Sequence, residues 1–205
     1  VIPYAGLQAC FAAAALVAFG VALFVRAAER QWTPRRLSAY LALSLLVAAP
    51  ILHYYKPWEP LLMTSGAYYN GIRLASQLPQ QENFRDLFLK QNRLLFYEEG
   101  RECVVAVRET AEDRALVING KVDASLNGDS TTQKLLAHLP LTLHGSAKSA
   151  LVIGWGSGTT VGSASLYPLQ HLLCAEIEPA VFRTGPLFSA VNFEVWKDPR
   201  FSLAA

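Results

Sequence analysis

Two long stretches without charged residues open the chain. Residues 1–25 and 37–55 are both uncharged and mostly apolar. A helix of about 20 apolar residues crosses a hydrocarbon core about 30 Å thick, and both runs approach or exceed that length. Tyr54, Tyr55 and Trp58 close the second run with the aromatic belt typical of a bilayer interface. The pattern predicts two transmembrane helices within residues 1–56, joined by a basic loop.

Other interpretations of these runs remain open. A signal peptide has the right apolar length, but no basic segment precedes the first run and a second run follows it. Two buried helices of a water-soluble protein are a further alternative, although a helix apolar all round is rare in water. The loop contains Arg26, Arg30, Arg35 and Arg36, which the positive-inside rule places in the cytoplasm, with later residues outside.

After a polar and aromatic linker over residues 57–93, the pattern becomes one of short strands. Runs such as CVVAVR and ALVI, rich in β-branched residues and separated by polar turns, predict a small β-hairpin region over 94–125. Asn119-Gly120 is its strongest turn signal. Residues 80–93 fit either a short helix or a loop.

Strands and helices alternate over residues 126–205. The predicted elements are helix 130–139, strand 150–153, helix 159–166, strand 172–175, helix 179–188 and strand 191–195. Pro140 is expected to end or kink the first helix. The apolar strands are of the buried parallel kind, so the alternation predicts the first half of a Rossmann-like parallel sheet in an α/β domain.

Composition narrows the classes of protein. The 205 residues are 52% hydrophobic and 17% charged, with a net charge of +2. This balance excludes disorder as the dominant state, and so small a charge does not indicate a nucleic-acid partner. Cys10, Cys103 and Cys174 are scattered without metal-ligand spacing, so neither a metal site nor a disulfide scaffold is predicted.

Candidate chemistry lies at a glycine-rich bend. Gly154, Gly156 and Gly158 follow a predicted strand and precede a predicted helix, where glycine allows a tight turn and close approach of a ligand to the backbone. Glu176 ends the next strand, in the position of a carboxylate that binds ribose hydroxyls. The spacing lacks the third glycine of the dinucleotide fingerprint, so a nucleoside such as S-adenosylmethionine fits better than NAD. A glycine-rich turn without a ligand is the alternative.

Several segments resemble one family. LVIGWGSGTTVGSAS, LLCAEIEPAV and DPRFSL resemble the nucleoside-binding core of spermidine synthases, the polyamine aminopropyltransferases. NGKVDASLNGDSTTQKLLAHLPLTLH resembles the segment that joins their β-domain to that core. WEPLLMTSGAYYNG resembles bacterial membrane-fused spermidine synthase-like proteins. The resemblance implies a fold of the S-adenosylmethionine methyltransferase type and a multi-pass protein of the cell inner membrane. A nucleoside ligand implies a cytoplasmic soluble domain, against the charge rule on the visible loop.

The resemblance also implies site residues. Gln133 occupies the position of a glutamine that binds decarboxylated S-adenosylmethionine, Glu176 that of the ribose acid, and the glycines that of the glycine loop. Ser157 stands where the family has an acid that grips the amine, and Thr132 where it has a substrate-facing tyrosine. The expected cosubstrate-binding residues are Gln133, Gly154, Gly156, Ser157, Gly158 and Glu176.

The implied reaction is aminopropyl transfer from decarboxylated S-adenosylmethionine to an amine acceptor such as putrescine, in polyamine biosynthesis and without a metal. The implied partners are a lipid bilayer and a second copy of the chain. The family's catalytic aspartate belongs to a later motif, so no catalytic residue is assigned and we expect a fragment. The alternatives are a methyltransferase-like protein that uses S-adenosylmethionine, and a membrane transport or anchoring module with a degenerate nucleoside domain.

Other polar residues are interpreted as structural. Asp123 is expected in a turn, Asp129 as a helix cap and Glu178 as a solvated carboxylate beside Glu176. His138 and His144 have no partner acid at recognisable spacing, and residues 198–200 predict a turn before a strand.

Overall fold

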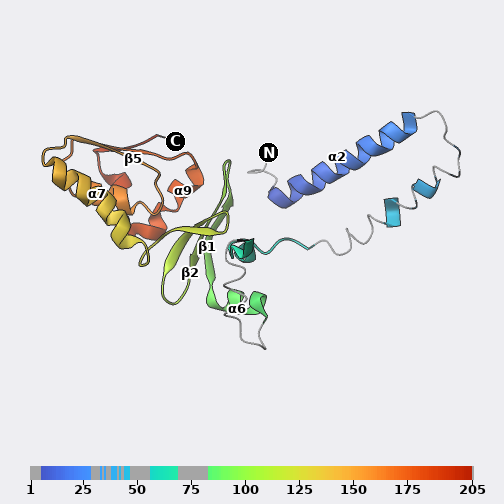
Figure 1. Ribbon diagram of the computed structural model, residues 1–205, viewed down its shortest axis with the longest axis horizontal. Coiled ribbons are helices and arrows are strands. Elements are labelled where there is room, and N and C mark those ends of the chain that lie inside the picture. The colour runs from blue at the N-terminus through green and yellow to red at the C-terminus, as the bar shows by residue number, and fades with distance from the viewer. Residues whose placement is uncertain are drawn as a thin grey trace. The chain divides into compact units, whose positions relative to one another are not determined.

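The computed structural model describes residues 6–28, 33, 35, 38–40, 42, 44–46, 56–68 and 83–204 (Figure 1). The chain forms two compact units, Val1–Trp58 and Glu59–Ala205.

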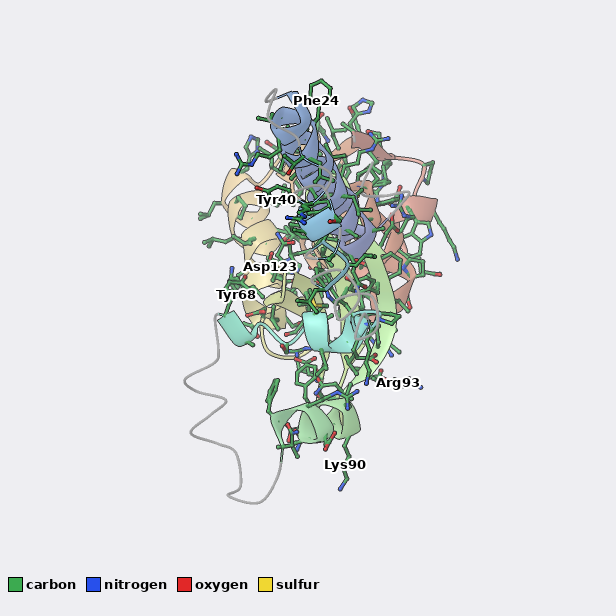
Figure 2. All side chains as sticks on the ribbon, turned by 90° about the vertical axis from the view of Figure 1, so that its right-hand side faces the viewer. Phe24, Tyr40, Tyr68, Lys90, Arg93 and Asp123 are labelled. Atoms are coloured by element: carbon green, nitrogen blue, oxygen red, sulfur yellow. The ribbon has the colours of Figure 1, made fainter. Side chains whose placement is uncertain are left out.

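The first unit contains α2 (Leu7–Ala28). Its apolar side chains are exposed along its length, including Phe24 (Figure 2). Within the described residues, Leu7–Arg26 is the one helix long and apolar enough to cross a membrane. The second predicted span, residues 37–55, lies largely outside the described residues, and those of its residues that are described are helical. The structure therefore supports one candidate span, and not the multi-pass arrangement.

The start of α2 contacts the chain that follows the second apolar run. The Gln8 side chain donates to the carbonyl of Lys56 at 2.9 Å and accepts from the backbone N–H of Trp58 at 3.0 Å. The Phe11 and Trp58 rings lie 6.1 Å apart, centre to centre. The interfacial tryptophan expected from the sequence therefore packs against the first turns of α2.

The described residues at the start of the second unit include the short helices α4 (Pro60–Met63) and α6 (Phe84–Gln91). Asn83 caps α6 by accepting from the backbone N–H of Arg85 at 3.0 Å. This cap and the buried Phe88 decide for the helix where the sequence also allowed a loop. Lys90 lies in the exposed last turn of α6, and Arg93 begins the first strand (Figure 2).

An antiparallel meander follows. It contains β1 (Arg93–Glu99), β2 (Val104–Glu109), β3 (Arg114–Ile118) and β4 (Lys121–Ser125), paired in that order. Asn119 and Gly120 join β3 to β4, and both have positive φ, as a two-residue hairpin turn of the primed type requires. The predicted hairpin region is thus a four-stranded sheet.

Helix α7 (Ser130–His144) continues past Pro140, where the sequence predicted an end or a kink. Proline removes one hydrogen bond but does not forbid the next turn. The helix ends at Gly145, which has a φ of 73° and donates its N–H to the carbonyl of Leu141. Asp129 occupies the N-cap position without a side-chain capping bond.

A parallel sheet completes the unit. Its strands are β5 (Ser149–Ile153), β6 (His171–Ala175) and β7 (Phe201–Ala204), in that spatial order, with α8 (Thr159–Ser165) and α9 (Pro179–Arg183) between them in sequence. The predicted helix 179–188 is α9 followed by the 3-10 helix η1 (Gly185–Phe188).

The predicted third strand at 191–195 is wrong. That segment contains the end of α10 (Ser189–Asn192) and the start of the 3-10 helix η2 (Val195–Lys197). Asn192 explains the difference, because its buried amide donates to the carbonyls of Ser157 at 3.0 Å and Gly185 at 2.9 Å. These bonds hold the segment in turns, and the strand begins only after residues 198–200.

The two sheets share one hydrophobic core. It joins side chains of the antiparallel sheet, such as Val107 and Leu116, to Trp155, Val161 and Phe188 of the parallel half. In Figure 1 the green strands β1 and β2 lead into the yellow-to-red part that contains α7, β5 and α9. The loops that follow β5 and β6 are therefore built on a common packed base.

Candidate functional site

The glycine-rich bend lies between β5 and α8. Gly154, Gly156 and Gly158 have φ values of 90°, 57° and 79°, a region that L side chains rarely adopt. A Cβ on Gly154 would meet nothing within 4 Å, and one on Gly156 would meet only the Cβ of Ala124, at 4.0 Å. A Cβ on Gly158 would lie 2.7 Å from Cζ2 of Trp155. The first two glycines thus leave backbone open to a ligand, while the third permits packing.

Glu176 faces this bend from the end of β6. Its Oε2 accepts from the backbone N–H of Trp155 at 2.7 Å, and its Oε1 accepts from the backbone N–H of Glu178 at 2.9 Å. The side chain is buried. A carboxylate oxygen has two lone pairs, so each oxygen retains the capacity to accept from a further hydroxyl. The structure brings the acid and the bend together at neighbouring strand ends.

Gln133 and Ser157 meet on the other side of the bend. The buried Ser157 hydroxyl donates to Oε1 of Gln133 at 2.7 Å and lies 2.7 Å from Oγ1 of Thr159. Thr160 donates its hydroxyl to the backbone carbonyl of Gln133 at 2.9 Å. These bonds attach α7 to the start of α8, so all six sequence-predicted site residues lie on or beside one bend.

Glu178 is not the solvated carboxylate expected from the sequence. It is buried, accepts from the backbone N–H of Ala180 at 3.0 Å to cap α9, and accepts from that of Glu102 at 2.9 Å. Burial alone would raise the pKa of Glu178, but the backbone donors of Glu102, Ala180 and their neighbours outweigh it and hold that pKa below its usual range. The Glu-Pro pair before a helix was the sequence signal for this cap.

Trp155 and Asn192 also support the site, and the sequence analysis did not predict either residue. The Trp155 ring is buried behind the bend and packs edge-on against Phe182 at 4.7 Å between centres. Asn192 holds the bend through the carbonyl of Ser157. The large Trp155 between two glycines is unusual and could have indicated a packing role, whereas no local sequence pattern indicates a role for Asn192.

Several carboxylates act on Cys103, the residue that precedes β2. Burial, followed by the charges of Glu178, Glu176, Asp123 and Glu102, raises the pKa of Cys103 to about 11. The Cys103 thiol is therefore protonated at neutral pH and is a poor nucleophile. Asp123 is exposed and pairs with Lys121 at 3.1 Å (Figure 2). Across the described residues, no group of three or more His, Cys, Asp or Glu side chains is placed to hold a metal ion.

Curated proteins similar to this chain are polyamine aminopropyltransferases. The protein of Sodalis glossinidius is 27% identical over 124 residues, which cover 60% of this chain and 43% of that protein. The protein of Thermoanaerobacter sp. (strain X514) is 27% identical over 126 residues, with coverages of 60% and 45%. The chain thus spans less than half the length of these curated relatives. No protein-family model matches it.

Solved spermidine synthases share the fold. One, in complex with the transition state analogue AdoDATO, has a TM-score of 0.51 and 18% sequence identity, and the match covers 55% of this chain and 40% of that one. Spermidine synthase from Thermotoga maritima gives the same values. The chain is therefore similar to polyamine aminopropyltransferases over 60% of its length, and it shares the fold of spermidine synthases over 55%.

Proposed function

We propose that this chain contains the cosubstrate-binding part of a membrane-anchored, spermidine synthase-like aminopropyltransferase. The observation that carries the proposal is the Glu176 carboxylate, which lies 2.7 Å from the Trp155 backbone N–H in the open glycine bend. The polyamine aminopropyltransferases among its relatives support the reaction class. The apolar helix α2 supports the anchor.

The site binds an S-adenosyl sulfonium compound, either decarboxylated S-adenosylmethionine or S-adenosylmethionine. The ribose hydroxyls donate to Glu176, and the nucleoside lies against the uncovered backbone of Gly154 and Gly156. Glu176 and Glu178 lie just beyond the carboxyl end of β6, where their negative charges attract a positively charged sulfonium.

In aminopropyl transfer, the nitrogen of an acceptor amine such as putrescine attacks the carbon next to the sulfonium. A carbon–nitrogen bond forms, the carbon–sulfur bond breaks, methylthioadenosine leaves and a base takes the amine proton. Such a reaction depends on proximity and on one nearby proton acceptor. In this proposal the described residues supply the cosubstrate side of the site, and no residue is assigned as the base.

Methyl transfer from S-adenosylmethionine is the second candidate. The same ribose acid and bend serve both reactions. Ser157 is uncharged and bonded to Gln133, so it provides no negative charge to bind a cationic amine.

Binding measurements on the full chain in detergent test the proposal. Calorimetry is expected to show binding of at least one of S-adenosylmethionine, its decarboxylated form and methylthioadenosine. Because hydrogen bonds to charged groups contribute about 1.5–3 kcal/mol each, Glu176→Ala is expected to abolish measurable binding. Asp86→Ala, which removes an exposed acid of α6, is the charge-matched control and should leave affinity unchanged. Unchanged affinity in Glu176→Ala would show the ribose assignment to be wrong.

A further inference from the structure

Trp155 is the one bulky side chain of the glycine-rich bend. The residues on either side of it, Gly154 and Gly156, have no side chain to pack, and a Cβ on either would meet at most one atom, the Cβ of Ala124 at 4.0 Å. Glycine has more backbone freedom than any other residue, so these two glycines do not fix the bend by packing. The Trp155 ring is 2% exposed. It is therefore the side chain through which the fold can hold this part of the bend.

The Trp155 ring lies among aromatic side chains from three elements. Its centre is 4.7 Å from that of Phe182 in α9, 5.9 Å from that of Phe201 in β7 and 6.3 Å from that of Trp196 in η2. Backbone also approaches the ring closely, because a Cβ on Gly185 would lie 3.1 Å from Cζ2 of Trp155. Side chains packed this closely leave little room for a large ring to shift.

Packing, and not a hydrogen bond, holds this ring. Among the residues that the structure describes, Nε1 of Trp155 is the one buried side-chain nitrogen or oxygen without a hydrogen-bond partner. An indole N–H is only a donor, and a buried donor without a partner opposes folding. A phenylalanine at this position would therefore keep an aromatic ring in the cluster and lose a donor that the fold does not use.

The backbone of Trp155 connects the ring to the acid of the site. Its N–H donates to Oε2 of Glu176 at 2.7 Å, and its carbonyl accepts from the N–H of Gly158 at 2.8 Å. The other oxygen of Glu176 accepts from the backbone N–H of Glu178 at 2.9 Å. Each carboxylate oxygen is thus held by one backbone N–H, so the direction in which Oε2 offers its second lone pair depends on the position of Trp155.

We propose that Trp155 is a positioning residue for ribose recognition. Its packed ring fixes the backbone N–H that orients Glu176, and the oriented carboxylate selects ribonucleosides over 2′-deoxyribonucleosides. This inference rests on the proposed function, in which Glu176 accepts from the ribose hydroxyls, and it specifies how that contact is held. Hydrogen bonds are directional, so a carboxylate that is free to turn loses selectivity for the hydroxyl rather than affinity for the rest of the nucleoside.

Calorimetry on the full chain in detergent tests the inference by comparing methylthioadenosine with its 2′-deoxy analogue. The wild type is expected to bind the analogue about tenfold more weakly, because one hydrogen bond to a charged group is lost. Trp155→Leu is expected to reduce this ratio to about twofold by weakening methylthioadenosine, because its carboxylate is no longer oriented. Trp155→Phe, which keeps a ring in the cluster, should retain the wild-type ratio.

The outcomes distinguish the inference from the proposed function. A Trp155→Leu variant that keeps the wild-type ratio, even with both ligands weakened, would show a role in packing alone and overturn the inference, while the proposed function stands. Absence of binding of both ligands to the wild type overturns the proposed function, and this inference with it.

Two further variants separate positioning from general loosening of the aromatic cluster. Phe182→Leu leaves Trp155 in place but removes the ring at 4.7 Å, and it is expected to reduce the ratio to about threefold. This variant tests the inference even where Trp155→Leu does not fold. Trp196→Phe alters the same cluster at a more distant ring and is the matched control, with an unchanged ratio expected. Equal losses of selectivity in Phe182→Leu and Trp196→Phe would overturn the inference.

Discussion

The two sheets of the second unit are covered to very different extents. In the antiparallel sheet, Val107 and Leu116 are at most 1% exposed. In the parallel sheet, Leu151 is 58% and Ile153 84% exposed, although parallel strands usually have both faces covered. The antiparallel sheet therefore contributes these side chains to the hydrophobic core. The described parallel strands leave Leu151 and Ile153 exposed and have the candidate site at their carboxyl ends.

Specific polar contacts join the loops of the parallel sheet to the antiparallel one. Glu178 accepts from the backbone of Glu102, which lies between β1 and β2. Arg183 of α9 pairs with Glu98 of β1. Because few atoms make these contacts, we expect single substitutions at them to lower the free energy of unfolding more than substitutions on the exposed face of the parallel strands.

The largest effect is expected at the bend. Gly158→Ala places a Cβ 2.7 Å from the Trp155 ring and 2.9 Å from the Cβ of Asn192, at a φ of 79°. Overpacking and backbone strain together should lower the free energy of unfolding by about 4 kcal/mol, measured by urea denaturation with tryptophan fluorescence.

Gly145→Ala is the matched control for that substitution. Gly145 has a similar φ of 73°, but a Cβ there would meet nothing within 4 Å. Only the conformational cost of about 1 kcal/mol should remain. Equal losses in the two variants would show that the packing around Gly158 is not what holds the bend.

Matched leucines in the two sheets test the comparison directly. Leu116→Ala in β3 removes a side chain that is 1% exposed and should lower the free energy of unfolding by about 3 kcal/mol. Leu151→Ala in β5 removes an exposed side chain and should change it by less than about 0.5 kcal/mol. A large loss at Leu151 would mean that the open face of the parallel sheet is covered in solution.

An effect smaller than those at Gly158 and Leu116 is expected at Glu178, and it depends on pH. The folded-state pKa of Glu178 lies below its usual 4.5, so its charge stabilises the fold at higher pH and the contribution is lost as pH falls through the folded value. Glu178→Gln should cost about 2 kcal/mol at pH 7, because an amide N–H then faces a backbone donor. Denaturation curves at several pH values should show this difference shrinking below pH 4.5.

One result of the pH series would contradict the prediction for Glu178. A difference between wild type and Glu178→Gln that stays constant from pH 7 down to pH 3 would mean that the charge of Glu178 does not hold the loop after β1. Glu194→Gln, an exposed acid of the same half paired with Lys197, should change stability by less than about 0.5 kcal/mol throughout.

Local pattern in the sequence predicted much of this protein. An uncharged run of 25 residues predicted the exposed apolar helix α2. Asn119-Gly120 predicted a tight turn, and both residues have the positive φ values that such a turn requires. A short apolar strand, three glycines and a helix predicted the bend, because each of these features depends on neighbours within a few residues.

Features that depend on contacts between residues far apart in the sequence were decided only by the tertiary structure. Glu178 is bonded to a loop 76 residues away, Asn192 to a carbonyl 35 residues away, and Ser157 to a glutamine 24 residues away. These bonds bury an acid that the sequence left in solvent and place the third strand at Phe201–Ala204, beyond its predicted position. A local pattern contains no information on such partners, because folding brings them together only when the two sheets pack on one core.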